Sequence, residues 1–250
     1  GDPQSSSTLR QGPNRVAFLL CGGLGTRLRG VKARPKALVE VAGWPFLRYH
    51  LALLRGGRVG RTVYLTGYRG EEVDEAFGPA SPERVFSREP DPLGTGGALA
   101  QARAHAGETN WIANGDSFVD CAPEELFQAH RPGTGTILAV QVDDRADYGG
   151  LEIGADGRID RFVEKGTHEP GWINAGIYIL DRLFLMELPI GRSSLERDHF
   201  PRLAASGKLF AYQADAFFRD IGTPERLEAA QGEFVAIRER LRDSGGETAR

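Results

Sequence analysis

An apolar run that stops at glycine, near the start of the chain, most narrows what this sequence can fold into. Residues 16–21 (VAFLLC) are continuously apolar, and Gly22 and Gly23 follow them. Such a short run is typical of a strand buried on both faces, whereas an amphipathic helix would carry polar residues at regular intervals. Strands of that kind occur mainly in parallel sheets covered by helices, so the run predicts a buried parallel sheet.

The segments that follow alternate between helix and strand patterns. Residues 46–54 set Phe46, Leu47, Leu51 and Leu54 on one helical face, and Gly56-Gly57 ends the pattern. The alternation predicts a doubly wound, Rossmann-like α/β sheet. Its remaining elements are expected as strands at 61–66, 84–87 and 111–114 and as helices at 71–77 and 97–105.

The second half of the chain, after Pro123, has a different pattern of expected elements. A long strand pattern covers residues 135–142, and Asp156-Gly157 marks a tight turn between shorter, partly alternating segments. We therefore expect antiparallel strands to join the sheet, which makes it mixed. The further strand candidates are residues 150–153, 159–164 and 175–180, and a helix with alternating charges is expected at 224–241.

The length of the chain suits one sizeable α/β domain. We expect a single domain over residues 15–243. Residues 1–14 are polar and rich in turn formers, so they are expected to be a disordered lead or a non-native remnant. Residues 244–250 are expected to form a flexible tail.

The charge balance excludes some classes of partner. The 31 basic and 34 acidic residues give a net charge of -3, whereas binders of nucleic acid and anionic membranes rely on a positive excess. We therefore expect no nucleic-acid or membrane partner, although a small anionic ligand needs only a local cationic cluster.

Cysteine and histidine usage points away from disulfides and zinc. Cys21 and Cys121 show no pairing pattern, and the five histidines lack metal-ligand spacing. No apolar stretch reaches the roughly 18 residues of a membrane span. A cytoplasmic location is the expectation, and the sequence leaves the oligomeric state open, a homo-oligomer included.

The glycine turn after the first strand is a candidate phosphate site. In a doubly wound sheet ligands gather beyond the carboxyl ends of the strands, where glycines expose backbone N–H groups to a phosphate. The dinucleotide-binding pattern fails because position 28 is leucine, and the P-loop pattern fails because Val31-Lys32 follows Gly30. A tight turn with a surface arginine is the alternative for the glycines alone.

The full segment Gly22-Gly23-Leu24-Gly25-Thr26-Arg27-Leu28, with Pro35-Lys36 after it, resembles the opening motif of the sugar-1-phosphate nucleotidylyltransferases. The resemblance implies a nucleoside-triphosphate loop in which backbone amides, Arg27 and Lys36 hold the phosphates. Two further segments extend it. Gly94-Thr95-Gly96-Gly97 resembles the family's nucleobase and ribose segment, and Asn114-Gly115-Asp116 resembles the strand end that supplies an aspartate to Mg²⁺.

Later segments resemble the family's sugar-phosphate side. Tyr148-Gly149 resembles an element whose backbone touches the sugar, and the pair Glu164-Lys165 implies a glutamate on sugar hydroxyls and a lysine on the sugar phosphate. Asn174 and Glu196 are implied as further sugar contacts. The last match, Asp220 in D-I-G-T-P, implies a second metal ligand, while Thr223 and Pro224 also fit the start of a helix.

The resemblance implies transfer of a nucleoside monophosphate to a sugar 1-phosphate, with release of pyrophosphate. Both substrates are anions, so cations must offset their repulsion. The implied catalytic set is Arg27, Lys36, Asp116, Lys165 and Asp220, with Asp116 and Asp220 as ligands of the cofactor Mg²⁺, which prefers oxygen donors.

Within the family the motifs look most like those of D-glycero-D-manno-heptose 1-phosphate guanylyltransferases, which implies GTP and that heptose 1-phosphate as substrates. One departure is Glu89-Pro90-Asp91-Pro92-Leu93, two residues longer than the expected pattern and close to where the base is read. The alternatives are a uridylyl- or thymidylyltransferase acting on a hexose or N-acetylmuramic acid 1-phosphate, and a non-catalytic nucleotide-binding relative. A metal-dependent glycosyltransferase would show an Asp-x-Asp element, which Asp116-Ser117-Phe118 lacks.

Overall fold

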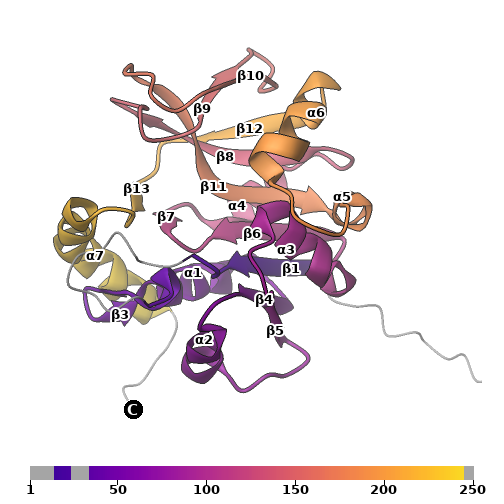
Figure 1. Ribbon diagram of the computed structural model, residues 1–250. Coiled ribbons are helices and arrows are strands. Elements are labelled where there is room, and N and C mark those ends of the chain that lie inside the picture. Colours follow the sequence, from indigo (N-terminus) through magenta and orange to yellow (C-terminus); the bar gives the residue numbers. More distant parts are fainter. Residues whose placement is uncertain (1–13, 24–33, 245–250) are drawn as a thin grey trace, which may run out of the picture.

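The fold was obtained as a computed structural model, which describes residues 14–23 and 34–244. Four parallel strands form one half of the central sheet, in the order β6-β1-β4-β5. Three helices connect them, so the predicted doubly wound arrangement is confirmed (Figure 1). The elements are β1 (Arg15–Leu20), α1 (Phe46–Leu54), β4 (Arg61–Thr66), α2 (Gly70–Phe77), β5 (Arg84–Arg88), α3 (Gly94–Ala102) and β6 (Thr109–Asn114).

The other half of the sheet is built on one long strand, β11 (Gly171–Asp181), which pairs antiparallel with β6, β8 and β9. Strand β12 pairs parallel with β8, and β10 pairs antiparallel with β9. The sheet is therefore mixed, as the second half of the sequence predicts. The bounds are β8 (Gly135–Val142), β9 (Gly150–Ile153), β10 (Ile159–Val163) and β12 (Leu209–Ala214).

The remaining elements are short, apart from α7 (Pro224–Ser244), which begins as the sequence predicts. Its first turn is capped by Thr223, whose Oγ1 accepts a hydrogen bond from the N–H of Arg226 at 3.2 Å. The others are β2 (Glu40–Val41), β3 (Trp44–Pro45), β7 (Ser117–Val119), α4 (Pro123–Ala129), α5 (Arg182–Glu187), α6 (Phe200–Ala205) and β13 (Phe218–Asp220). Single turns lie at Lys36–Leu38, Arg55–Gly57 and Arg103–His105, with a π-helical turn at Leu195–His199.

The core explains the continuous apolar run of β1. Its alternate residues Val16 and Phe18 pack with α3 and α6 on one face, while Ala17 and Leu19 pack with α1 and α4 on the other. All four are fully buried. A third cluster lies between α1 and α7, where the rings of Tyr49, Phe118 and Phe234 contact one another.

Two predicted elements are divided differently in the structure. The helix expected at 97–105 begins at Gly94 and ends in a separate turn at Arg103–His105. The strand expected at 175–180 is part of the longer β11, which is interrupted by a register shift between Asn174 and Tyr178. Gly176, at a φ of +80°, lies within the shift, so the regular strand pattern is interrupted near residue 175, where the sequence predicts the strand to begin.

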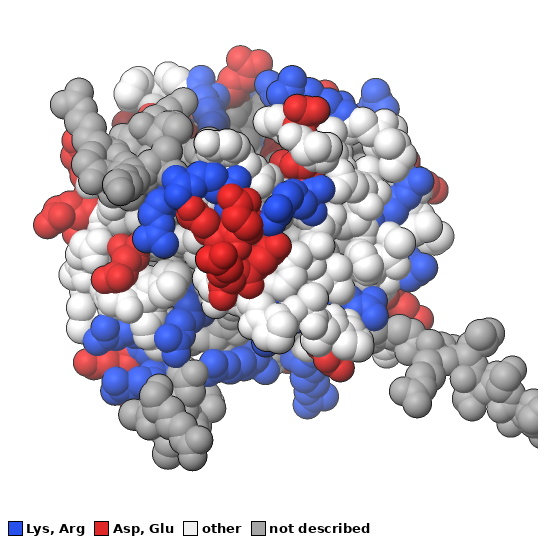
Figure 2. Space-filling model, turned by 60° about the horizontal axis from the view of Figure 1, so that its bottom comes forward, with Lys and Arg blue, Asp and Glu red and all other residues white. Residues whose placement is uncertain are grey.

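The surface near α2 pairs charges of opposite sign. In Figure 2, with the side that carries α2 turned forward, acidic side chains form a group bordered by basic ones. Arg88 lies 2.9 Å from Asp74 and 3.7 Å from Glu71, and Arg69 pairs with Glu72. Opposite charges therefore offset one another there.

Among residues 14–23 and 34–244, no helix combines the length and apolarity needed to cross a membrane.

Candidate active site

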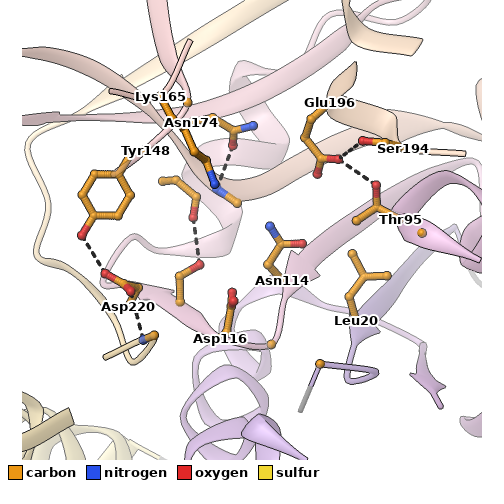
Figure 3. Close-up of a pocket in the computed structure, with 18 of the residues that line it drawn as sticks. Leu20, Thr95, Asn114, Asp116, Tyr148, Lys165, Asn174, Ser194, Glu196 and Asp220 are labelled. Carbon is orange, nitrogen blue, oxygen red and sulfur yellow. Dashed lines mark hydrogen bonds between the residues drawn. The ribbon is translucent and has the colours of Figure 1, made fainter. Parts of the chain in front are cut away.

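A pocket of about 1390 Å³ lies where the carboxyl ends of the parallel strands meet. This exceeds the ~300–1,000 Å³ that suits one drug-sized ligand, so there is room for two reactants. Figure 3 shows Tyr148, Lys165 and Asp220 on one side, Leu20 and Thr95 on the other, and Asn114 and Asp116 between them. We name the first side the β11 flank (Tyr148, Glu164, Lys165, Asn174, Asp220) and the second the β5 flank (Leu20, Gly22, Leu65, Glu89, Gly94, Thr95, Ala98).

The glycine turn and the following lysine meet at the centre of the pocket. Gly22 and Gly23 line it, and the carbonyl of Gly23 accepts a hydrogen bond from the N–H of Lys36 at 3.0 Å. The Nζ of Lys36 lies 3.5 Å from Oδ2 of Asp116. The predicted phosphate contacts Gly25, Thr26 and Arg27 lie outside the described residues.

The segment after β6 is held against β1. The N–H of Gly115 donates to the carbonyl of Leu20 at 2.9 Å, and a Cβ on Gly115 would lie 2.5 Å from that oxygen. Only glycine allows the two strand ends to approach so closely. The Asn114 and Asp116 side chains are thereby held at the mouth of the pocket.

The two candidate metal ligands come together through a short antiparallel ladder. β13 pairs with β7 so that Asp220 lies opposite Ser117, and the N–H of Ile221 donates to the carbonyl of Asp116 at 3.0 Å. The Asp116 side chain is 46% exposed and that of Asp220 only 14%. The structure therefore joins residues about a hundred positions apart in the sequence at one site.

Asp220 is fixed by three donors. Its Oδ1 accepts from the hydroxyl of Tyr148 at 2.6 Å, and its Oδ2 accepts from the N–H of Gly222 at 3.0 Å and from Arg226 at 3.2 Å. Arg226 also pairs with Asp147 and lies over the Tyr148 ring, 5.2 Å from its centroid. Burial, with a further contribution from the hydrogen bond to Asp220, raises the pKa of Tyr148, so its hydroxyl stays a donor.

These two carboxylates fit a metal ion that arrives with a substrate. Among the described residues, no group of three or more His, Cys, Asp or Glu side chains could hold a metal ion. Mg²⁺ is commonly bound by one or two carboxylates together with substrate phosphates and water. Asp116 and Asp220 therefore suit Mg²⁺ that is bound jointly with a phosphate.

The β11 flank carries the predicted sugar-side residues. Glu164 and Lys165 follow β10 directly, are exposed, and line the pocket with Tyr148, Gly149 and Asn174. The Asn174 amide donates to the Tyr178 hydroxyl at 3.0 Å and accepts from the N–H of Gly176 at 2.8 Å. Its orientation is thus set by the bulge in β11.

Glu196 bridges the two flanks. Its Oε2 accepts from the hydroxyls of Thr95 at 2.7 Å and Ser194 at 3.1 Å (Figure 3). Its Oε1 accepts from the Tyr178 hydroxyl at 2.8 Å. Burial and the nearby Glu196 carboxylate raise the pKa of Tyr178. Glu196 therefore ties the start of α3 to β11 besides lining the pocket.

The second glycine segment divides into two roles. Gly94 and Thr95 line the pocket, whereas Gly96 and Gly97 do not. A Cβ on Gly96 would lie 2.4 Å from Oγ of Ser193, and one on Gly97 would lie 2.4 Å from the carbonyl oxygen of Gly191. Gly94 also meets this segment, since its Cβ would lie 2.4 Å from the carbonyl oxygen of Ser193, so close packing against residues 191–193 accounts for glycine at all three positions.

Several lining residues have no counterpart in the sequence analysis, among them Tyr178, Arg197 and Arg226. Arg226 could have been noticed because it comes two residues after the D-I-G-T-P segment, in the first turn of α7. Cys21 also lines the pocket, and burial raises the pKa of its thiol. It is therefore a protonated, apolar residue and not a nucleophile.

Comparison with known proteins places this geometry in a family. Residues 16–235 match the family model described as nucleotidyl transferase. The D-glycero-alpha-D-manno-heptose 1-phosphate guanylyltransferase of Aneurinibacillus thermoaerophilus is 33% identical over 224 residues, which are 87% of this chain and 97% of that protein. The mannose-1-phosphate guanylyltransferase catalytic subunit beta of Drosophila pseudoobscura pseudoobscura is 34% identical over 220 residues, covering 84% of this chain.

The chain spans only 59% of the length of that mannose-1-phosphate relative. Among solved structures, HddC from Yersinia pseudotuberculosis, crystallised with GMP-PN, has a TM-score of 0.76 and 32% identity, and the match covers 88% of this chain and 99% of that one. The resemblance drawn from the motifs is thus confirmed at the level of the family. The chain belongs to the nucleotidyl transferase family.

Proposed function

We propose that this protein transfers GMP from GTP to a sugar 1-phosphate, releasing pyrophosphate and a GDP-sugar, and that the sugar is D-glycero-D-manno-heptose. One observation carries the proposal. A single pocket unites a glycine turn, Lys36 and Asp116 at the strand ends with Lys165 and Asn174 on the β11 flank. Two phosphorylated substrates bound on these two sides would meet at the centre.

The chemistry needs no nucleophilic side chain. An oxygen of the sugar phosphate forms a bond to the α-phosphorus of GTP, and the bond from that phosphorus to the bridging oxygen of pyrophosphate breaks. Because the attacking oxygen is already anionic, no general base is required. The protein's task is to align two anions and to offset their repulsion, for which Lys36 lines the pocket beside Asp116 and Lys165 lines the β11 flank.

Asp116 and Asp220 are proposed to hold Mg²⁺ together with phosphate oxygens. When bound, the ion would neutralise phosphate charge and help to orient the nucleotide. The residues of this chain prepare the site: Tyr148, Gly222 and Arg226 hold the Asp220 carboxylate in one orientation, and the Asp116 carboxylate stays partly exposed. Arg27 is carried over from the motif as a further phosphate contact.

The choice of base and sugar rests on the relatives. The heptose and the mannose relatives described above are both guanylyltransferases. Heptose is chosen over mannose on the motifs of this chain, which resemble those of the heptose 1-phosphate guanylyltransferases most.

The test combines the protein with Mg²⁺, each nucleoside triphosphate in turn, and a panel of the 1-phosphates of heptose, mannose, glucose and N-acetylmuramic acid. Pyrophosphate release is followed, and products are identified by mass. We expect release with GTP and heptose 1-phosphate at a higher kcat/KM than with any other pair. Preference for mannose 1-phosphate would revise the sugar, and preference for UTP or dTTP would revise the base. Nucleotide binding without release for every pair would favour the non-catalytic alternative.

A further inference from the structure

Each of the two carboxylates that the proposed function gives to a metal ion already has a cationic partner. Among the described residues, Lys36 lies 3.5 Å from Asp116. Arg226 lies 3.2 Å from Asp220. Two negative and two positive charges therefore offset one another where the metal ion would bind. Lys36 has a further use, since the proposed function assigns it to the phosphates, whereas Arg226 lines the same pocket without any such assignment.

Arg226 lies in the first turn of α7, which is an unfavourable place for a cation. Its N–H donates to Oγ1 of Thr223 at 3.2 Å, and its side chain is 23% exposed. The N–H groups at the start of a helix carry partial positive charge, so a guanidinium there costs some helix stability. The helix therefore gives no reason for an arginine at this position, and the reason has to come from what its side chain contacts.

The guanidinium of Arg226 joins three groups of the pocket wall. Nη1 donates to Oδ2 of Asp220, Nη2 pairs with Asp147, and the central carbon lies 5.2 Å from the centroid of the Tyr148 ring. Tyr148 in turn donates to Oδ1 of Asp220 at 2.6 Å (Figure 3). One side chain of α7 thus holds the last residue of β13 and the segment that carries Tyr148. Two forked N–H groups make this possible, which a lysine does not have.

The donors around Asp220 leave its carboxylate with little spare capacity to accept. A carboxylate has about four lone-pair sites in all. On Oδ2 both sites are used, by the N–H of Gly222 at 3.0 Å and by Arg226. On Oδ1 one is used by Tyr148, so a single site remains there. Because this carboxylate is neutralised and only 14% exposed, a cation alone gains little by giving up its water to reach it.

A nucleoside triphosphate would change this balance. It brings several negative charges, and its phosphate oxygens supply most of the ligands that Mg²⁺ needs. The ion then requires only one oxygen from Asp220, which is what Arg226 and Tyr148 leave open. Lys36, the cationic partner of Asp116, can at the same time interact with the phosphates.

We propose that Arg226 is a positioning residue that makes metal binding depend on the nucleotide. It cancels the charge of Asp220 and leaves one oxygen site open, so that Asp116 and Asp220 take a divalent ion together with phosphates and not alone. This inference rests on the proposed function, which places the metal ion on these two carboxylates. The alternative is that Arg226 only supports the start of α7.

The experiment measures the Mn²⁺ that stays with the protein in equilibrium ultrafiltration, with and without an equimolar amount of GTP. Mn²⁺ accepts the same oxygen ligands and octahedral geometry as Mg²⁺, and neither Mn²⁺ nor GTP is retained unless the protein binds it. The unmodified protein should bind Mn²⁺ at least about tenfold more tightly with GTP than without it. Arg226→Gln should bind Mn²⁺ alone about tenfold or more tightly than the unmodified protein, because a unit charge beside Asp220 is removed. A gain of affinity is the informative sign, since loss of structure would weaken binding.

Arg219→Gln is the matched control for the change of charge. Arg219 directly precedes Asp220 and is 28% exposed, close to the 23% of Arg226, but its guanidinium pairs with Glu233 at 2.9 and 2.6 Å. Its substitution should leave Mn²⁺ affinity within about threefold of the unmodified protein. Arg226→Lys keeps the positive charge, so it should bind Mn²⁺ alone as weakly as the unmodified protein.

Unchanged or weaker Mn²⁺ binding by folded Arg226→Gln would overturn the proposal and leave Arg226 as a support for α7. A gain of equal size in Arg219→Gln or in Arg226→Lys would also overturn it, because the charge of Arg226 would then not be the cause. Equal Mn²⁺ affinity of the unmodified protein with and without GTP would overturn it without any variant. A gain in Arg226→Gln, with no pyrophosphate release by the unmodified protein from any substrate pair, would instead contradict the proposed reaction and leave the role of Arg226 intact.

Discussion

The two flanks of the pocket are built in different ways. On the β5 flank, apolar walls and backbone groups predominate, and each lining residue closely follows or ends a strand or begins α3. On the β11 flank, polar side chains hold one another: Tyr148 bonds to Asp220, Arg226 to Asp220, and Asn174 to Tyr178. The difference fits the proposed function, in which the β5 flank holds part of the nucleotide and the β11 flank positions charge with prearranged groups.

Asp116, between the flanks, should show the largest effect. We expect Asp116→Asn to lower kcat by about 100- to 1000-fold, because a carboxylate facing the phosphates is lost. Stability should hardly change, since the side chain is 46% exposed and its partner Lys36 is 3.5 Å away. Pyrophosphate release measures the first effect and urea unfolding the second. Asp160→Asn, on the exposed side of β10, is the control; equal turnover in both variants would remove Asp116 from the mechanism.

His50 tests the packing of α1 against β7, the strand that follows Asp116. It is 2% exposed among Phe46 and Phe118, and burial lowers its pKa from 6.5 to about 4, although a backbone hydrogen bond at Ser117 opposes the shift. The unfolded chain therefore binds more protons than the folded protein between these values. The free energy of unfolding should fall by about 3 kcal/mol from this group as pH drops through that window.

Urea unfolding between about pH 7 and pH 4 measures this dependence. His50→Leu should show a shallower loss of stability with acid, because other groups still titrate but position 50 no longer does. Parallel pH profiles for the two proteins would show that His50 is not held neutral in the folded state.

A smaller effect should separate glycines that serve packing from glycines that face the pocket. Gly97→Ala should lower the free energy of unfolding by about 1–3 kcal/mol, since its Cβ would overlap the carbonyl of Gly191. Gly149→Ala should leave stability within about 0.5 kcal/mol, because nothing lies within 4 Å of the new Cβ. Thermal unfolding of both variants provides the measurement. Equal stability would mean that residues 191–193 yield readily to the added methyl group.

The smallest change in stability should come from Lys165→Ala. Its effect on the two KM values should nevertheless distinguish the two flanks. Lys165 is exposed and forms no ion pair with any described residue, so unfolding should change by less than about 0.5 kcal/mol. The KM for the sugar phosphate should rise about tenfold while the KM for GTP stays unchanged. Lys208→Ala, another exposed lysine, is the control. A rise in the KM for GTP instead would mean that Lys165 contacts the nucleotide and not the sugar phosphate.

The sequence predicted the elements whose signals are local. The helix Phe46–Leu54 and the strands Arg61–Thr66 and Gly135–Val142 have the predicted bounds, because apolar periodicity and glycine stops lie within each segment. β13 could not be found in this way, since it has three residues and owes its existence to β7, a hundred positions earlier. Strand β12 and helix α4 were likewise not recognised, although Pro123 and two glutamates mark the first turn of α4.

The residues of the site divide in the same way, into those that a local motif marks and those that depend on distant partners. Motifs predicted that Lys36, Asp116, Lys165 and Asp220 would share a pocket, and all four line it. Arg226 was missed because its partner Asp147 lies 79 positions away and belongs to no shared motif. The sequence could not show that Gly94 lines the pocket while Gly96 and Gly97 do not, because all three glycines are required by close packing and look alike in a sequence.

The bulge at Gly176 limits how far a change in the sheet can spread. β9 pairs with β11 only at Trp172 and Ile173, before the bulge, whereas β6 pairs from Ile177 onward. Slippage of the β9–β10 hairpin along β11 would be absorbed at the irregular residue instead of reversing the faces of the strand beyond it. Asn114 and Asp116 should therefore keep their positions when an insertion lengthens this hairpin.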